Sequence, residues 1–506
     1  MTAPMSVERL RRDGEAFMQE LSLEFYESLS GLKGEAQIQR VYEKYRAIFS
    51  DESLDVAREM FEGSTEGSDD RRSARIILDW QVESRSGQQL AALDEQEIEW
   101  EGEKLVRLPD GREIPFQRVA IDIANSSDRE ERAMIEGARV DVVRRELAPL
   151  KRERIQRERD ITESVGIANG YNATWELLSG ISLSALGDEC AAFLRDTQSM
   201  WDDVAAEVVK RVLGMTVREA SRADALALFR AREFDEFFPA RDMETTIRGQ
   251  VAEMGIESSA NGRIRFDTGE RDGKRSRAFC SPVKVPDEVY LVLRPHGGQT
   301  DWNTFLHEYG HALHFAYMRP DLPMEFRFMG DNSVTEGYAM LFDHLMQDAG
   351  WLQRYTGLDK KTVPVFLRSA GFEELHYLRR YCAKFLYETQ LYGGEQSFDA
   401  LPDVYVELLT KATSFQYSTA DAFVDVDARF YSARYLRAWQ FQALYTESLV
   451  ERYDADWWRN PRCGPWMVES LFGEAQRELA HEQAMRVTGR TLGFAPLIRS
   501  VERMLG

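Results

Sequence analysis

The segment from Trp302 to Ala316 reads Trp-Asn-Thr-Phe-Leu-His-Glu-Tyr-Gly-His-Ala-Leu-His-Phe-Ala and is the most informative stretch of the chain. Successive residues are about 100° apart around a helix axis, so the large apolar side chains of this segment fall on one side. His307, His311 and His314 gather on the opposite side, where a surface helix would carry charged residues. The pattern predicts a helix that packs through one face and lines a polar cavity with the other.

Within this segment, His307, Glu308 and His311 form the short motif His-Glu-x-x-His. Two histidines four residues apart on a helix can bind one Zn²⁺ ion, and the glutamate between them can act as a general base. Histidines that are hydrogen-bonded or solvated without a metal would show the same spacing. A catalytic zinc site needs three protein ligands, so the rest of the chain has to supply a third.

Glu336 is the candidate third ligand, and it opens a segment with helical apolar spacing at residues 335–346. Asp343 lies seven residues further on, hence on the same face, where it could accept the outer N–H of a ligand histidine. Ser333 and Glu336 also have the spacing of a capping box, which would make the glutamate a helix-start device. We expect one Zn²⁺ per chain, held by His307, His311 and Glu336.

The composition is that of a folded globular protein, with 43% hydrophobic and 11% aromatic residues in 506. A net charge of −22 argues against nucleic acid and an anionic membrane surface as partners. We see no signal peptide, no apolar run long enough to span a bilayer, and no cysteine pattern of a disulfide framework or a zinc site. These features predict a cytoplasmic protein.

The fold class is predicted to be mainly α, with two small β elements. Periodic helical segments cover residues 5–80, 128–250 and most of the chain beyond 300, whereas residues 97–123 read as a β-meander and residues 263–294 as a second β region. We expect residues 1–250 to form a mostly helical N-terminal part and residues 251–506 a catalytic part. Both would be lobes of one catalytic unit.

Four further residues are candidates for contact with a substrate. Tyr431 and Tyr435, one turn apart in a helix predicted over residues 418–453, could donate hydroxyls to a developing oxyanion, and Arg434 could hold a carboxylate. Core aromatics would show the same spacing. His296 follows the strand predicted at residues 289–294 and could also contact the substrate, although a loop histidine is more often structural. The edge of that strand could pair with an extended peptide.

The stretch His307-Glu-Tyr-Gly-His-Ala-Leu-His314 resembles the His-Glu-x-Gly-His-x-x-His signature of the thimet oligopeptidase and oligoendopeptidase F family. Glu336 stands at the spacing of that family's third zinc ligand. Upstream, Glu270–Cys280 is similar to a Gly-Lys-Arg-Ser-Gly-Ala stretch of oligoendopeptidase F relatives. The resemblance covers roughly residues 260–345 and implies a large helical fold with a deep channel, one zinc ion and cleavage of internal bonds in short peptides.

The chain departs from the family at one position that bears on function. The family places a histidine shortly before its substrate-binding tyrosines, whereas this chain has no histidine between residues 377 and 480, and Asp425 or Asp427 stands in that neighbourhood. We expect a zinc peptidase for short oligopeptides with Glu308 as general base. A carboxypeptidase acting at peptide C-termini, with Arg434 as the anchor, and a catalytically silent peptide-binding relative are the alternatives.

Overall fold

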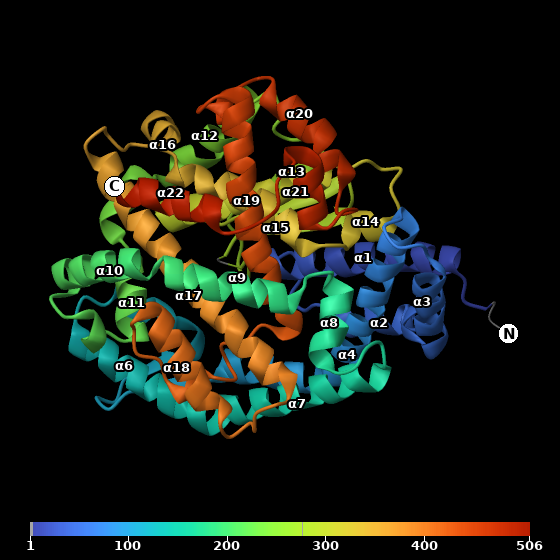
Figure 1. Cartoon of the computed structure of the whole chain (residues 1–506), viewed down its shortest axis with the longest axis horizontal. Coiled ribbons are helices and arrows are strands. Elements are labelled where there is room, and N and C mark those ends of the chain that lie inside the picture. Colours follow the sequence, from blue (N-terminus) through green and yellow to red (C-terminus); the bar gives the residue numbers. More distant parts are fainter. Residues whose placement is uncertain (1–3, 276) are drawn as a thin grey trace. The chain divides into compact units, whose positions relative to one another are not determined.

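Helices dominate the computed structural model, which describes residues 4–275 and 277–506 (Figure 1). This confirms the mainly α class. Ser276, which belongs to the stretch Glu270–Cys280, lies outside the described residues. Several helices begin at a side chain that accepts a first-turn N–H. Ser6 does so from Arg9 at α1 (Val7–Leu29), and Asp348 does so from Trp351 at α16 (Ala349–Tyr355).

The chain divides into two compact units, each made of three separate segments. The first contains Met1–Ser84, of which residues 4–84 are described, with Glu233–Leu367 and Arg437–Leu497. The second contains Arg85–Arg232, Arg368–Leu436 and Ile498–Gly506. The sequence pattern placed a single boundary near residue 250. Four of the five observed boundaries fall inside α-helices, so no break in the helical pattern marks them.

The first unit holds helices from all three of its segments around one sheet. They are α1, α2 (Ile38–Lys44), α3 (Asp51–Gly63), the start of α4 (Asp69–Glu103), α12 (Ala240–Glu253), α13 (Gln299–Tyr317), α14 (Met324–Phe328), α15 (Asn332–Asp343), α16, the start of α17 (Thr362–Gly393), most of α19 (Tyr431–Tyr453), α20 (Cys463–Ser470), α21 (Ala480–Thr488) and the start of α22 (Ala495–Leu505). Helix α13 contacts both the sheet and α15, so it lies in the core of this unit (Figure 1).

The sheet of the first unit has the strand order β3-β5-β4. Strand β3 (Ile264–Asp267) pairs parallel with β5 (Glu288–Val292), and β4 (Phe279–Lys284) pairs antiparallel with it. These strands confirm the β region predicted for residues 263–294. The prediction that an edge of residues 289–294 could pair with a peptide is wrong, because β5 is the central strand and both its edges are taken. The outer strands are β3 and β4.

The second unit is also helical. It contains most of α4 and α17, together with α5 (Val119–Asn125), α6 (Arg129–Val142), α7 (Ala148–Val165), α8 (Tyr171–Ser179), α9 (Leu183–Asp196), α10 (Gln198–Leu213), α11 (Arg222–Phe229), α18 (Leu401–Thr413) and the end of α22. A single turn with π-type hydrogen bonds, Val143–Leu147, joins α6 to α7.

The meander predicted at residues 97–123 is a two-stranded hairpin. Its strands are β1 (Leu105–Arg107) and β2 (Glu113–Pro115), paired antiparallel. Residues 97–103 alternate between acidic and other residues, which imitates a strand, but they form the last turns of α4. They do so because Trp100 packs edge-on against Phe116, with the ring centres 4.8 Å apart, and beside the buried cluster around Val143.

The helix predicted over residues 418–453 is shorter than expected at its N-terminal end. Helix α19 begins at Tyr431, and the residues before it form two separate turns, Thr419–Asp421 and Ala428–Phe430. Arg429 and Phe430 have φ values of 57° and 54°, in the left-handed region that a continuing right-handed helix cannot use. Asp427 therefore does not share a helix face with Tyr431.

Within residues 4–275 and 277–506, no single helix is both long enough and apolar enough to cross a membrane, and only the sharply bent pair α8 and α9 reaches that length and composition when taken together.

Candidate metal centre

Helix α13 carries the predicted motif and packs as its apolar pattern indicated. The side chains on its apolar face are at most 1% exposed: Trp302, Phe305, Leu306, Tyr309, Leu313 and Ala316. Its N-terminal end is held by Asp301, whose Oδ2 accepts the backbone N–H groups of His296 (2.6 Å) and Gly297 (2.8 Å). These two bonds tie the loop before α13 to the first turn of the helix.

Gly310 explains how α15 comes close enough to supply a third ligand. A Cβ atom at this position would lie 2.7 Å from Cα of Ala339 and 2.9 Å from the carbonyl oxygen of Tyr338. Both atoms belong to the backbone of α15, so the two helices touch where α13 has no side chain. His307 lies three residues before this contact point and His311 one residue after it, so both are within one turn of it.

Helix α15 begins one turn before Glu336, and its cap is not the one that the sequence suggested. Asp331 is the N-cap residue, and its side chain accepts the N–H of Ser333 at 2.9 Å. Its second oxygen accepts the N–H of Ala480, also at 2.9 Å. Glu336 is therefore not a partner of Ser333 in a capping box. It lies inside a helix in which every residue from Ser333 to Asp343 is buried.

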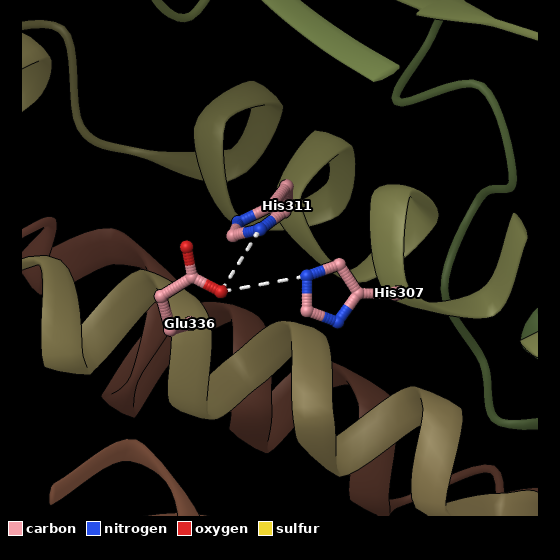
Figure 2. Close-up of side chains that lie close together, drawn as sticks. All are labelled: His307, His311 and Glu336. Carbon is pink, nitrogen blue, oxygen red and sulfur yellow. Dashed lines mark ion pairs between the residues drawn. The ribbon is translucent and has the colours of Figure 1, made fainter. Parts of the chain in front are cut away.

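His307, His311 and Glu336 converge on one point (Figure 2). Oε2 of Glu336 lies 3.4 Å from Nε2 of His307 and 3.7 Å from Nε2 of His311. One ligand atom from each residue lies within 4.8 Å of the others. Tetrahedral Zn²⁺ with ligands at about 2.0–2.1 Å separates its ligand atoms by about 3.3–3.4 Å, so these side chains fit zinc with small adjustments.

The outer nitrogens of both histidines are hydrogen-bonded, which orients the rings. Nδ1 of His307 is 2.8 Å from Oδ2 of Asp343, as the sequence predicted for that aspartate. Nδ1 of His311 is 2.9 Å from the hydroxyl oxygen of Thr335, a partner that the sequence analysis did not name. With the proton on Nδ1 in each ring, both Nε2 lone pairs face Glu336, where a cation would be held.

A proton and a cation compete for the point between His307, His311 and Glu336. Burial alone would lower the pKa of His307, but Asp343 and Glu336 outweigh it and raise that pKa to about 10. Burial lowers the pKa of His311. A divalent cation bound between these side chains would therefore compete with a proton on His307.

Glu308 is oriented by the sheet. Its Oε2 accepts the backbone N–H of Cys280 in β4 at 2.9 Å. Burial and the nearby Glu308 raise the pKa of the Cys280 thiol well above its ordinary value, so this sulfur stays protonated. No sequence pattern indicates this bond, because the donor is a backbone group whose position depends on the sheet.

His314 does not join the group, although it follows the motif at helical spacing. It is fully buried among aromatic rings, 4.8 Å from the ring centre of Tyr338 and 5.9 Å from that of Phe472. Burial lowers its pKa to about 3, so it remains neutral in the core. The predicted polar face of α13 is therefore limited to the first two histidines.

His296 lies in the first unit and is exposed in the loop before α13. Tyr431, Arg434 and Tyr435 belong to the second unit, at the start of α19. The rings of the two tyrosines are 5.1 Å apart, and Tyr381 of α17 lies 5.9 Å from Tyr435. The roles of these residues toward a substrate stay predictions.

Asp425 and Asp427, which stand where the family has a histidine, are tied into a network of buried ions in the second unit. Asp425 pairs with Arg380 at 2.5 Å and accepts the hydroxyl of Tyr405 at 2.8 Å. Asp427 pairs with Lys384 at 2.9 Å. Burial opposes the charge of Asp425, but Arg380 and Lys384 lower its pKa to about 2. These contacts assign both aspartates to the support of the turn before α19.

The sequence matches no model of a known protein family, and a search of curated proteins also finds no match. Function is therefore inferred from the geometry around α13 and α15.

Proposed function

We propose that this protein is a zinc-dependent peptidase that hydrolyses peptide bonds of short oligopeptides. The observation that carries the proposal is the convergence of His307, His311 and Glu336, with Glu308 held beside them by a bond to β4. Two histidines and one carboxylate from two touching helices are the ligand set of zinc hydrolases that keep a fourth position open. The residues of the motif support membership of the thimet oligopeptidase and oligoendopeptidase F family.

A Zn²⁺ ion bound by these ligands would supply Lewis acidity for a water molecule and for the substrate carbonyl. Glu308 would take the proton of the attacking water and return it to the leaving amine. Its Oε2 is occupied by the N–H of Cys280, so Oε1 is the oxygen placed to accept that proton. Asp343 and Thr335 keep the imidazole rings from rotating while the proton moves.

Strand β4 supports a peptide as the substrate. Cys280 stands opposite Leu291 of β5, but its N–H points to Glu308 and not into the sheet. The outer edge of β4 therefore faces the proposed general base, whereas α1 covers one face of the strand, where Ser281 donates to the carbonyl of Ser22. At Cys280 and Pro282, a peptide along this edge could bond only to backbone carbonyls, because the N–H of Cys280 is taken by Glu308 and Pro282 has none.

The remaining parts of the proposal come from the predicted site residues. Tyr431 or Tyr435 would donate to the oxyanion, and His296 and Arg434 would contact the peptide outside the scissile bond. The four cysteines are free thiols, and three of them are buried, which supports a reducing compartment such as the cytoplasm.

The test is digestion of a mixed library of short peptides, with products identified by mass. Wild-type protein should cut internal bonds, and both a chelator and Glu308→Gln should abolish the cuts. Ladders that shorten from the C-terminus would replace the oligoendopeptidase with a carboxypeptidase. Bound zinc without any cleavage would leave a peptide-binding relative and contradict the proposed hydrolysis.

A further inference from the structure

Asp343 binds two imidazoles and not one. Its Oδ2 lies 2.8 Å from Nδ1 of His307, and its Oδ1 is hydrogen-bonded to Nδ1 of His344. The side chains of Asp343 and His344 are 10% and 12% exposed. The three side chains form a chain of hydrogen bonds that connects a proposed zinc ligand to a second histidine.

The contact between Asp343 and His344 is not an ordinary consequence of helix geometry. Neighbouring residues on an α-helix point about 100° apart and do not face each other. Helix α15 ends at Asp343, and a 3₁₀ turn, His344–Gln347, begins at the next residue. The end of the helix allows the imidazole of His344 to turn back onto the carboxylate that precedes it.

We propose that His344 is a positioning residue for the zinc ligand His307 and acts through Asp343. Its Nδ1–H donates to Oδ1, which fixes the plane of the carboxylate and leaves Oδ2 to accept Nδ1–H of His307. That bond keeps the His307 proton on Nδ1 and its Nε2 lone pair toward the metal. The inference rests on the proposed metal centre and concerns zinc affinity, so it does not depend on which bond the protein cleaves.

The two ligand histidines differ in this respect. His311 is oriented by a neutral hydroxyl, that of Thr335, whereas His307 is oriented by a charged carboxylate that has a donor of its own. A buried carboxylate without that donor could rotate and offer either oxygen to His307. His344 is therefore expected to matter for metal binding although it touches neither zinc nor substrate.

The experiment measures the dissociation constant of zinc by competition with a chromophoric chelator. His344→Leu, which removes the donor, should weaken zinc binding about tenfold, near the lower limit for partners of metal ligands. His344→Asn, whose amide N–H can occupy the place of Nδ1–H, should bind zinc close to the wild-type level. In an Asp343→Asn background, His344→Leu should have no further effect.

Unchanged zinc affinity in His344→Leu, equal losses in the leucine and asparagine variants, or full additivity with Asp343→Asn would each overturn the proposal. The unfolding midpoint of the zinc-free variants controls for a purely structural role, which would lower stability without this pattern in affinity. A ¹⁵N-histidine NMR spectrum of the wild type keeps the proposal testable should His344→Leu fail to fold. It should show a proton on Nδ1 of His344, and an unprotonated Nδ1 there contradicts the proposal. Wild-type protein that binds zinc but cleaves nothing would contradict only the proposed hydrolysis.

Discussion

Gly310 is the point at which α13 touches α15, so Gly310→Ala perturbs the metal centre without altering any proposed ligand. The new Cβ atom would lie 2.7 Å from Cα of Ala339 and 2.9 Å from the carbonyl oxygen of Tyr338. Carbon atoms in contact prefer about 3.5–4.0 Å, so the helices would have to separate by about 1 Å. Because the obstacle is backbone, no side-chain rotation can relieve it.

Two opposing terms set the effect of Gly310→Ala on stability. Overpacking costs about 1–3 kcal/mol, while alanine gains about 1 kcal/mol over glycine inside a helix. We expect a net loss of about 1 kcal/mol in the free energy of unfolding of the zinc-free protein. The effect on zinc should be larger, because Glu336 is already 3.4 Å and 3.7 Å from the two imidazole nitrogens. A further separation of about 1 Å exceeds what tetrahedral coordination allows, and we expect zinc affinity to fall about 10- to 100-fold.

The assays are urea unfolding of the zinc-free protein and zinc competition with a chelator. Gly249→Ala in α12 is the matched control, since Gly249 is an exposed helical glycine with no atom within 4 Å of an added Cβ. It should gain about 1 kcal/mol in stability and leave zinc affinity unchanged. If Gly310→Ala gained the same stability and bound zinc like the wild type, the contact between α13 and α15 would not set the geometry of the site.

Three further variants test separate parts of the account. Glu308→Gln should retain one zinc and lose nearly all peptide turnover, because the amide cannot take the proton of water; an unchanged rate in the peptide digest would reject the general base. Asp343→Asn should weaken zinc binding about 10- to 100-fold in the chelator assay while the protein stays folded, and wild-type affinity would show that the contact with His307 has no influence on the metal. His376→Phe should make the protein less sensitive to acid. Burial among aromatic rings, together with Arg380 and Arg379, lowers the pKa of His376 to about 3, below its ordinary value of 6.5. The unfolded chain therefore binds this proton at a higher pH than the folded protein does. The contribution of neutral His376 to the stability of the fold is complete above pH 6.5 and declines as the pH falls toward 3. At pH 5 the decline is about 2 kcal/mol. Urea unfolding at pH 7 and pH 5 should show a loss about 2 kcal/mol smaller in His376→Phe than in the wild type, and equal losses would contradict the buried neutral state.

The proposed metal ligands could be predicted from the sequence because their placement depends on local geometry. A spacing of four residues puts His307 and His311 on one helix face, and Asp343 follows Glu336 by two turns of the next helix. The apolar face of α13 was predictable for the same reason. His314 shares the spacing but not the environment, because the packing of Tyr338 and Phe472 around it involves residues far along the chain.

Features that depend on tertiary contacts were not predictable in this way. The alternating residues 97–103 resemble a strand in isolation, and only the packing of Trp100 against Phe116 reveals the end of α4. Strand β5 comes last of the three in sequence but lies at the centre of the sheet. The free edge was therefore predicted for the wrong strand. The left-handed backbone at Arg429 and Phe430 interrupts the helical pattern, so α19 starts later than propensity suggests. The sequence does not mark this break, because neither residue is a glycine.

Thr335 and His344, which orient His311 and Asp343, lie next to predicted site residues in sequence, but their contacts depend on tertiary structure. Thr335 is adjacent to Glu336 in sequence, but its bond to His311 requires the close approach of α13 and α15 at Gly310. His344 follows Asp343 directly, and helix geometry alone would have pointed the two side chains apart. Both contacts need the three-dimensional structure to be found.

Metal content shows whether His307, His311 and Glu336 together hold a zinc ion. The measurement is the ratio of metal to protein, by elemental mass spectrometry, for wild type and Glu336→Ala after equilibration with zinc and removal of the unbound ion. The wild type should hold one zinc per chain, and Glu336→Ala should hold clearly less. No zinc in the wild type, or one zinc still retained by Glu336→Ala, would contradict the assignment of these three residues as the metal centre.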